Sequence, residues 1–101
     1  MEIKNITIIG TGTLGLRIGL QSAISGYKVT CYDLTEEILA RSRKVIDKIL
    51  LQQLKLKFLD EAGKASALSK LSYTTDLQEA LSDCDLVSES VTEDLTLKEK
   101  V

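Results

Sequence analysis

The sequence lacks several residue types on which common active sites depend. None of its 101 residues is histidine, so the chain cannot build a histidine-based proton relay, catalytic triad or histidine metal site. Proline is also absent, where average usage would give about five residues in a chain of this length. Only two cysteines are present, which is too few for a disulfide framework, and we therefore expect a reducing, cytoplasmic environment.

Long apolar runs and an excess of one charge are missing too. The apolar stretches extend over only a few residues, too few for a transmembrane helix, and the first residues show no basic region followed by a long apolar one, as a secretory signal would. Thirteen basic and fifteen acidic residues leave a net charge of −2, which gives no reason to expect a nucleic acid or a membrane as partner. With 44% hydrophobic residues, the chain should fold as one small domain with a core.

The spacing of apolar residues predicts alternating strands and helices. A nearly continuous run at Ile3–Ile9 is typical of a strand buried on both faces, and helical spacing then leads to a C-terminal glycine at Gly26. Beyond it we expect strands at 28–32, 71–74 and 84–90, helices at 36–54, about 63–71 and 76–81, and a further helix beginning at Leu95. This order predicts an α/β fold of the Rossmann type, with a doubly wound, mainly parallel sheet in the order 3-2-1-4 and a helical hairpin inserted after the second strand.

A glycine-rich loop follows the first strand directly and opens the first helix. Gly10 permits a tight turn, Gly12 lets a pyrophosphate approach the backbone at the helix N-terminus, and Gly15 lets the helix pack closely on the strand. Asp33 ends the second strand, 18 residues after Gly15, where its carboxylate can accept hydrogen bonds from both ribose hydroxyls and would repel a 2′-phosphate. We therefore predict a site that prefers NAD to NADP, formed by Asp33 and the whole loop (Gly10, Thr11, Gly12, Thr13, Leu14 and Gly15).

The two cysteines are better explained by packing than by chemistry. In a 3-2-1-4 sheet the first strand lies between Cys31 and Cys84, and two steps of about 4.8 Å each put the two thiols beyond disulfide reach. We predict that both are small buried apolar groups, with a redox role as the alternative.

With these motifs in place, the chain resembles the N-terminal domain of the L-3-hydroxyacyl-CoA dehydrogenase family over essentially its whole length. The segments that carry the resemblance are residues 8–15, 26–33, the long basic helix that follows, 72–77 and 84–98. The last is the most specific, because generic Rossmann domains lack its Glu-small-x-x-Glu-x-Leu-x-x-Lys run. The resemblance implies that Ser90, Glu93 and Lys98 lie at the nicotinamide half of the site, where Ser90 leaves room for the cofactor, Glu93 accepts from ribose hydroxyls and Lys98 donates to ribose or carboxamide oxygens. Without the resemblance, Glu93 and Lys98 would read as the exposed, charged start of a helix.

The resemblance also implies a reaction, a substrate and a partner. Relatives transfer a hydride between NAD and the 3-position of an acyl-CoA in fatty-acid metabolism, and we expect the full-length parent to be a homodimer. The catalytic His–Glu pair of relatives lies beyond the aligned stretch, so we assign this chain no catalytic residue and no metal. Residues 1–101 should then be an incomplete NAD-binding domain without the helical catalytic and dimerisation domain, inactive alone. Its strand at 84–90 would be an open edge, prone to pair with a second chain.

Two other functions remain open at this point. The chain can be the cofactor half of another β-hydroxyacid-type dehydrogenase, against which the run from Glu93 to Lys98 argues, or a stand-alone dinucleotide-binding or sensor module without catalysis.

The helical hairpin of relatives contacts CoA through a hydroxyl residue and a lysine, but Ile49 and Leu56 occupy those positions here. The basic residues of this region either contact CoA phosphates or form a solvated face; they are Arg41, Arg43, Lys44, Lys48, Lys55 and Lys57.

Overall fold

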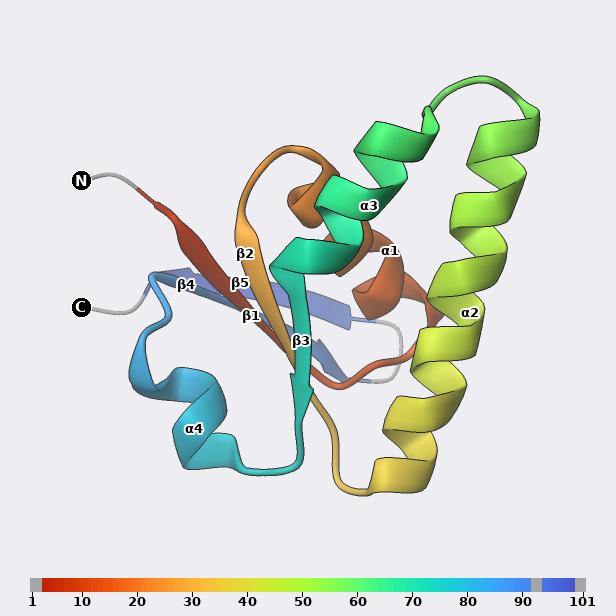
Figure 1. Ribbon diagram of the computed structural model, residues 1–101. Helices are drawn as coiled ribbons and strands as arrows, with labels where there is room; N and C mark the ends of the chain where they lie inside the picture. The colour runs from red at the N-terminus through yellow and green to blue at the C-terminus, as the bar shows by residue number, and fades with distance from the viewer. Residues whose placement is uncertain (1–2, 92–93, 100–101) are drawn as a thin grey trace.

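A computed structural model describes residues 3–91 and 94–99 of the chain as one sheet with helices on both faces (Figure 1). The strands are β1 (Asn5–Ile9), β2 (Lys28–Tyr32), β3 (Leu71–Thr74), β4 (Leu86–Val91) and β5 (Asp94–Glu99), in the sheet order β3-β2-β1-β4-β5. The strands β3, β2, β1 and β4 run parallel to one another, which confirms the predicted 3-2-1-4 order. Both β1 and β4 begin two residues later than the sequence predicted.

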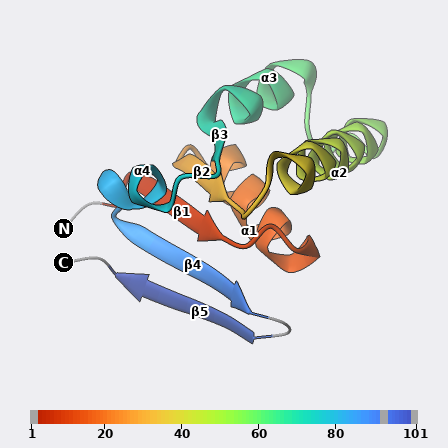
Figure 2. The same cartoon turned by 90° about the horizontal axis from the view of Figure 1, so that it is seen from below.

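The helix predicted to begin at Leu95 is wrong, because residues 94–99 form β5. This strand runs antiparallel to β4, with Val91 opposite Asp94 and Leu86 opposite Glu99, and Figure 2 shows it at the edge of the sheet. Leucine alternates with β-branched threonine in Leu95-Thr96-Leu97, a pattern of period two that suits a strand, and the backbone groups of β4 need partners that an antiparallel neighbour supplies. The predicted open edge at residues 84–90 is therefore also wrong, since β5 covers it.

The helices confirm the predicted hairpin, and the ends of α2, α3 and α4 lie within two residues of the predicted ones. They are α1 (Thr13–Ile24), α2 (Glu36–Lys55), α3 (Glu61–Lys70) and α4 (Leu77–Ser82), and Figure 1 shows α2 and α3 joined by a short loop as a helical hairpin. The Thr35 hydroxyl accepts a hydrogen bond from the Ile38 amide and so caps α2, while Gly26 ends α1 with a φ of 104° that only glycine adopts readily.

One face of the sheet is apolar and carries α1, α2 and α3. Gly19 brings the α1 backbone close to β1 and β2, because a Cβ atom there would lie 3.2 Å from Cγ1 of Ile8 and 3.8 Å from Sγ of Cys31. The Arg43 guanidinium of α2 lies 4.5 Å from the centroid of the Tyr73 ring, and Tyr73 is paired with Cys31 in the sheet. The hydrophobic core therefore lies between these helices and this face.

The opposite face carries a row of hydroxyl groups. Thr7, Thr30 and Ser72 occupy matching positions on β1, β2 and β3, and the Thr7 hydroxyl donates to the carbonyl of Ala80 in α4 at 2.6 Å. Helix α4 thus packs on this second face, and the doubly wound architecture is confirmed.

Both cysteines are buried and free, as predicted for apolar packing groups. Burial raises the pKa of the Cys31 thiol to about 12, so this group is a neutral thiol at physiological pH. None of the described helices is long and apolar enough to cross a membrane.

Candidate dinucleotide site

The loop between β1 and α1 has the geometry of an anion-binding turn. Gly10 adopts a φ of 88°, and its amide donates to the Tyr32 carbonyl at 3.0 Å, which ties the loop to the carboxyl end of β2. Gly12 is the N-cap of α1 and has no side chain to cap the helix, and no acidic residue lies in the first turn. The positive end of the helix dipole is therefore left for a ligand anion.

Gly12 also leaves the space that such a ligand needs. A Cβ atom at Gly12 would meet no atom of the described residues within 4 Å apart from its chain neighbours, and the backbone φ of −67° is open to any residue. No contact within the described part of the chain and no backbone constraint therefore requires glycine here. A pyrophosphate resting against the backbone would account for it, so this position fits the dinucleotide predicted from the sequence.

Asp33 follows β2 directly and contacts the same loop. Its Oδ2 accepts two hydrogen bonds from Thr11, one from the backbone amide and one from the hydroxyl, both at 2.8 Å. Its Oδ1 accepts a third from the Leu34 amide, also at 2.8 Å. The structure thus brings together two of the predicted site residues that are 22 positions apart in the chain.

These donors decide the charge of Asp33. Partial burial alone would raise the pKa of the carboxyl, but the hydrogen bonds from the Thr11 amide, the Leu34 amide and the Thr11 hydroxyl outweigh it and hold the pKa below its usual value. Asp33 is therefore ionised at physiological pH. A carboxylate that accepts hydrogen bonds from hydroxyls and repels a phosphate must carry this negative charge.

The other predicted site residues are placed by the backbone alone or lie outside the described residues. Thr13 begins α1, and Leu14 and Gly15 follow in its first turn. Ser90 lies near the carboxyl end of β4, whereas Lys98 lies in β5 opposite Val87, so the backbone does not bring these two together. Glu93 falls outside the described residues.

Two features of the site were not foreseen from the sequence. The contact between Thr11 and Asp33 was not predicted, although a hydroxyl residue between Gly10 and Gly12 is a visible signal for it. The hydrogen bond from the Gly10 amide to the Tyr32 carbonyl was not predicted either, because a bond between two backbone groups does not depend on the type of side chain.

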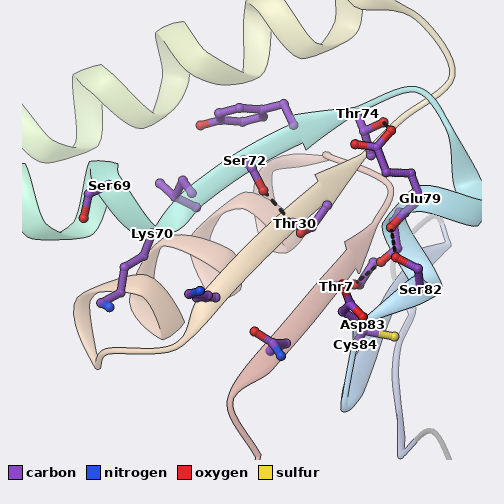
Figure 3. A pocket seen from close by; sticks show the side chains of 15 residues that line it. Thr7, Thr30, Ser69, Lys70, Ser72, Thr74, Glu79, Ser82, Asp83 and Cys84 are labelled. Carbon is purple, nitrogen blue, oxygen red and sulfur yellow. Dashed lines mark hydrogen bonds between the residues drawn. The ribbon is translucent and has the colours of Figure 1, made fainter.

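A cavity of about 680 Å³ lies elsewhere, on the hydroxyl-bearing face of the sheet. The Thr30 and Ser72 hydroxyls line it and lie 3.2 Å apart, and Figure 3 shows Lys70 at one end and Glu79 and Asp83 at the other. Neither Asp33 nor the glycines of the β1–α1 loop line it. Charged side chains of both signs that line it are exposed, namely Lys28, Glu79 and Asp83, as expected of a solvated groove.

No cluster of three metal-binding side chains occurs among the described residues. The basic side chains of α2 at positions 41, 43, 44 and 48 are exposed, and Arg43 is engaged with the Tyr73 ring.

Comparison with known proteins identifies the family. The family model described as "3-hydroxyacyl-CoA dehydrogenase, NAD binding domain" matches residues 5–101. The chain belongs to this family. The cofactor of this NAD-binding domain is therefore NAD, in agreement with the Asp33 and glycine-loop argument.

Several known proteins are similar to this NAD-binding domain in sequence or in structure. The mitochondrial hydroxyacyl-coenzyme A dehydrogenase of Rattus norvegicus is 38% identical over 104 residues, which cover 98% of this chain and 33% of the relative. FadB2 of M. tuberculosis is 34% identical with a TM-score of 0.88, covering 93% of this chain and 33% of that one. The (S)-3-hydroxybutyryl-CoA dehydrogenase PaaH1 from Ralstonia eutropha is 30% identical with a TM-score of 0.85, over 92% and 32% of the two chains. The chain spans about a third of the length of these relatives.

Proposed function

We propose that this NAD-binding domain serves a 3-hydroxyacyl-CoA dehydrogenase that oxidises the 3-hydroxyl group of an acyl-CoA, in fatty-acid metabolism. The observation that carries the proposal is the contact of Asp33 with the Gly10–Gly12 loop, beside a helix N-terminus with open space at Gly12. Bound NAD would supply the hydride acceptor at this site. The similarity of the chain to hydroxyacyl-CoA and 3-hydroxybutyryl-CoA dehydrogenases supports the acyl-CoA substrate.

In this proposal the residues of the chain bind and orient the cofactor. The loop amides and the α1 N-terminus hold the pyrophosphate, and the Asp33 carboxylate accepts from the adenosine ribose. By likeness to the family, Ser90 and Glu93 lie at the nicotinamide half. The same likeness assigns Lys98 there, but its register position opposite Val87 separates it from Ser90 and does not support that role. Residues 1–101 then form an incomplete NAD-binding domain, and the helical domain of the parent enzyme supplies catalysis and a homodimer interface. We further propose that the parent enzyme is cytoplasmic.

Titration calorimetry with NADH and NADPH tests the site. The chain should bind NADH more tightly, and Asp33→Asn should reduce the preference because it removes the charge that repels a 2′-phosphate. Asp60→Asn is the matched control, since Asp60 caps α3 away from the loop and asparagine caps a helix equally well. An unchanged NADH preference in Asp33→Asn would contradict the assignment of Asp33.

Turnover tests the division of labour. The chain contains no histidine to handle the alcohol proton, so acetoacetyl-CoA and NADH should not react in its presence. Turnover that follows the purified protein through fractionation, and is lost in Glu93→Ala, would contradict the proposal that catalysis requires a further domain.

A further inference from the structure

The Asp33 carboxylate is already largely committed within the described residues. An ionised carboxylate offers about four acceptor positions, two on each oxygen. Oδ2 accepts from both the amide and the hydroxyl of Thr11, and Oδ1 accepts from the Leu34 amide. The remaining acceptor position is on Oδ1. By this count, Asp33 offers one acceptor position to the two ribose hydroxyls while the Thr11 hydroxyl keeps its bond.

The Thr11 hydroxyl supplies the missing acceptor. Its single proton is donated to Asp33 Oδ2, so the lone pairs of its oxygen are left to receive a proton from another group. Thr11 is buried, with only 7% of its surface exposed, and its hydroxyl is bonded to Asp33, so the position of its side chain is fixed. A ribose hydroxyl can donate to such an oxygen, whereas a fully ionised phosphate has no proton to donate and would meet lone pairs.

We propose that Thr11 is a selectivity-determining residue of the NAD site, whose hydroxyl fixes the Asp33 carboxylate and presents its own oxygen as the second acceptor for the ribose hydroxyls. This inference rests on the proposed role of Asp33. It adds that discrimination against a 2′-phosphate is shared between a charged and a neutral group. The three donors that keep Asp33 ionised are consistent with it, because two of them belong to Thr11.

The measured quantity is the ratio of the dissociation constants of NADPH and NADH, obtained by calorimetry on the whole chain. Thr11→Val keeps the shape and the backbone amide but removes the hydroxyl, and the ratio should fall by about threefold to tenfold, the range that one hydrogen bond is worth. Thr11→Ser keeps the hydroxyl and should retain the wild-type ratio. Thr30→Val is the matched control, since it removes a threonine hydroxyl from β2 that contacts Ser72 on the other face of the sheet.

Three outcomes separate this inference from the proposed function. A reduced ratio in Thr11→Val, with wild-type ratios in Thr11→Ser and Thr30→Val, supports it. A wild-type ratio in Thr11→Val while Asp33→Asn loses the preference overturns the role of Thr11 and leaves that of Asp33 intact. An equal loss in Thr11→Ser and Thr11→Val overturns it as well, because packing rather than the hydroxyl would then be responsible. If Thr11→Val does not fold, as judged by thermal denaturation, Thr11→Ala gives the same comparison.

Discussion

Substitution of Gly12 by alanine separates the stability of the fold from the binding of the cofactor. The new methyl group would meet no described atom within 4 Å beyond its chain neighbours, and the φ of −67° and ψ of 170° suit alanine. Alanine is a poorer N-cap than glycine by about 0.5–1 kcal/mol, and it restricts the unfolded chain by about 0.4–1 kcal/mol in the opposite sense. The two effects nearly cancel, so the free energy of unfolding should change by less than about 1 kcal/mol.

The same methyl group should weaken NADH binding strongly. It occupies the space through which a pyrophosphate would reach the loop backbone, and the loss of one hydrogen bond to a charged group is worth about 1.5–3 kcal/mol. Since each 1.4 kcal/mol corresponds to about a tenfold change in affinity, we expect NADH to bind about 10- to 150-fold more weakly.

Gly19→Ala is the matched comparison because its methyl group points into the core. The Cβ atom would lie 3.2 Å from Cγ1 of Ile8, a side chain with no exposed surface on the central strand, so its neighbours have little freedom to move. Overpacking of about 1–3 kcal/mol exceeds the gain of about 0.5–1 kcal/mol in helix propensity, and the melting temperature should fall by several degrees. Cofactor affinity of the folded protein should stay at the wild-type value.

Thermal denaturation and NADH titration of the two variants test the reasoning together. The expected pattern is a binding defect with near-normal stability for Gly12→Ala, and a stability defect with normal binding for Gly19→Ala. Wild-type NADH affinity in Gly12→Ala would refute the placement of the pyrophosphate against this residue.

Three further substitutions test local features of the structure. Lys57 lies two residues after the end of α2 and has a φ of 62°, a conformation that glycine adopts more readily than lysine. Lys57→Gly should therefore raise the free energy of unfolding by about 1 kcal/mol, measured by urea denaturation. Lys55→Gly, inside the helix, is the comparison and should lower it. The Ser88 hydroxyl is buried and finds no partner in the described part of the chain, so Ser88→Ala should stabilise the protein by up to about 1 kcal/mol, and a clear loss of stability would contradict this. Hydrogen bonds from the Lys4 and Asn5 amides hold the pKa of Asp85 below its usual value, so its contribution is present above about pH 4 and lost as the pH falls further. Asp85→Asn should then destabilise the protein at pH 7 but not near pH 2, and an equal effect at both values would contradict the assignment.

The parallel part of the fold could be predicted from the sequence because strong local signals agree there. The sequence marks the start of α2 with Thr35, which caps the helix, and with Glu36 and Glu37 in the first turn, and Gly26 predicted the end of α1, since each of these residues satisfies a requirement of the helix end itself. Asp33 could be assigned to the site because the carboxyl end of a strand next to β1 brings it to the loop whatever the details of packing.

The C-terminal part could not be predicted because its structure depends on a distant partner. Residues 94–99 carry both helix-forming lysine and glutamate and an alternating Leu-Thr-Leu pattern, and the pairing of their backbone with β4 decides between the two. The hydrogen bond from the Thr11 hydroxyl to Asp33 escaped prediction for a related reason, since it depends on side-chain placement rather than on spacing.

The contact between Thr11 and Asp33 also reports whether the strands have paired correctly during folding. A slip of β2 against β1 by one residue would turn Val29 and Cys31 to the hydroxyl face and is opposed by burial, but a slip by two residues keeps every side chain on its own face. Such a slip would move Asp33 by about 6.6 Å, two residues of about 3.3 Å each, and would break its bonds to the loop. A ligand that needs both the loop and Asp33 therefore binds only the correctly registered sheet. At a concentration of one hundred times its dissociation constant, the cofactor would stabilise the correctly registered sheet over the slipped ones by about 2.7 kcal/mol. Cofactor binding would therefore select the correct strand register during folding.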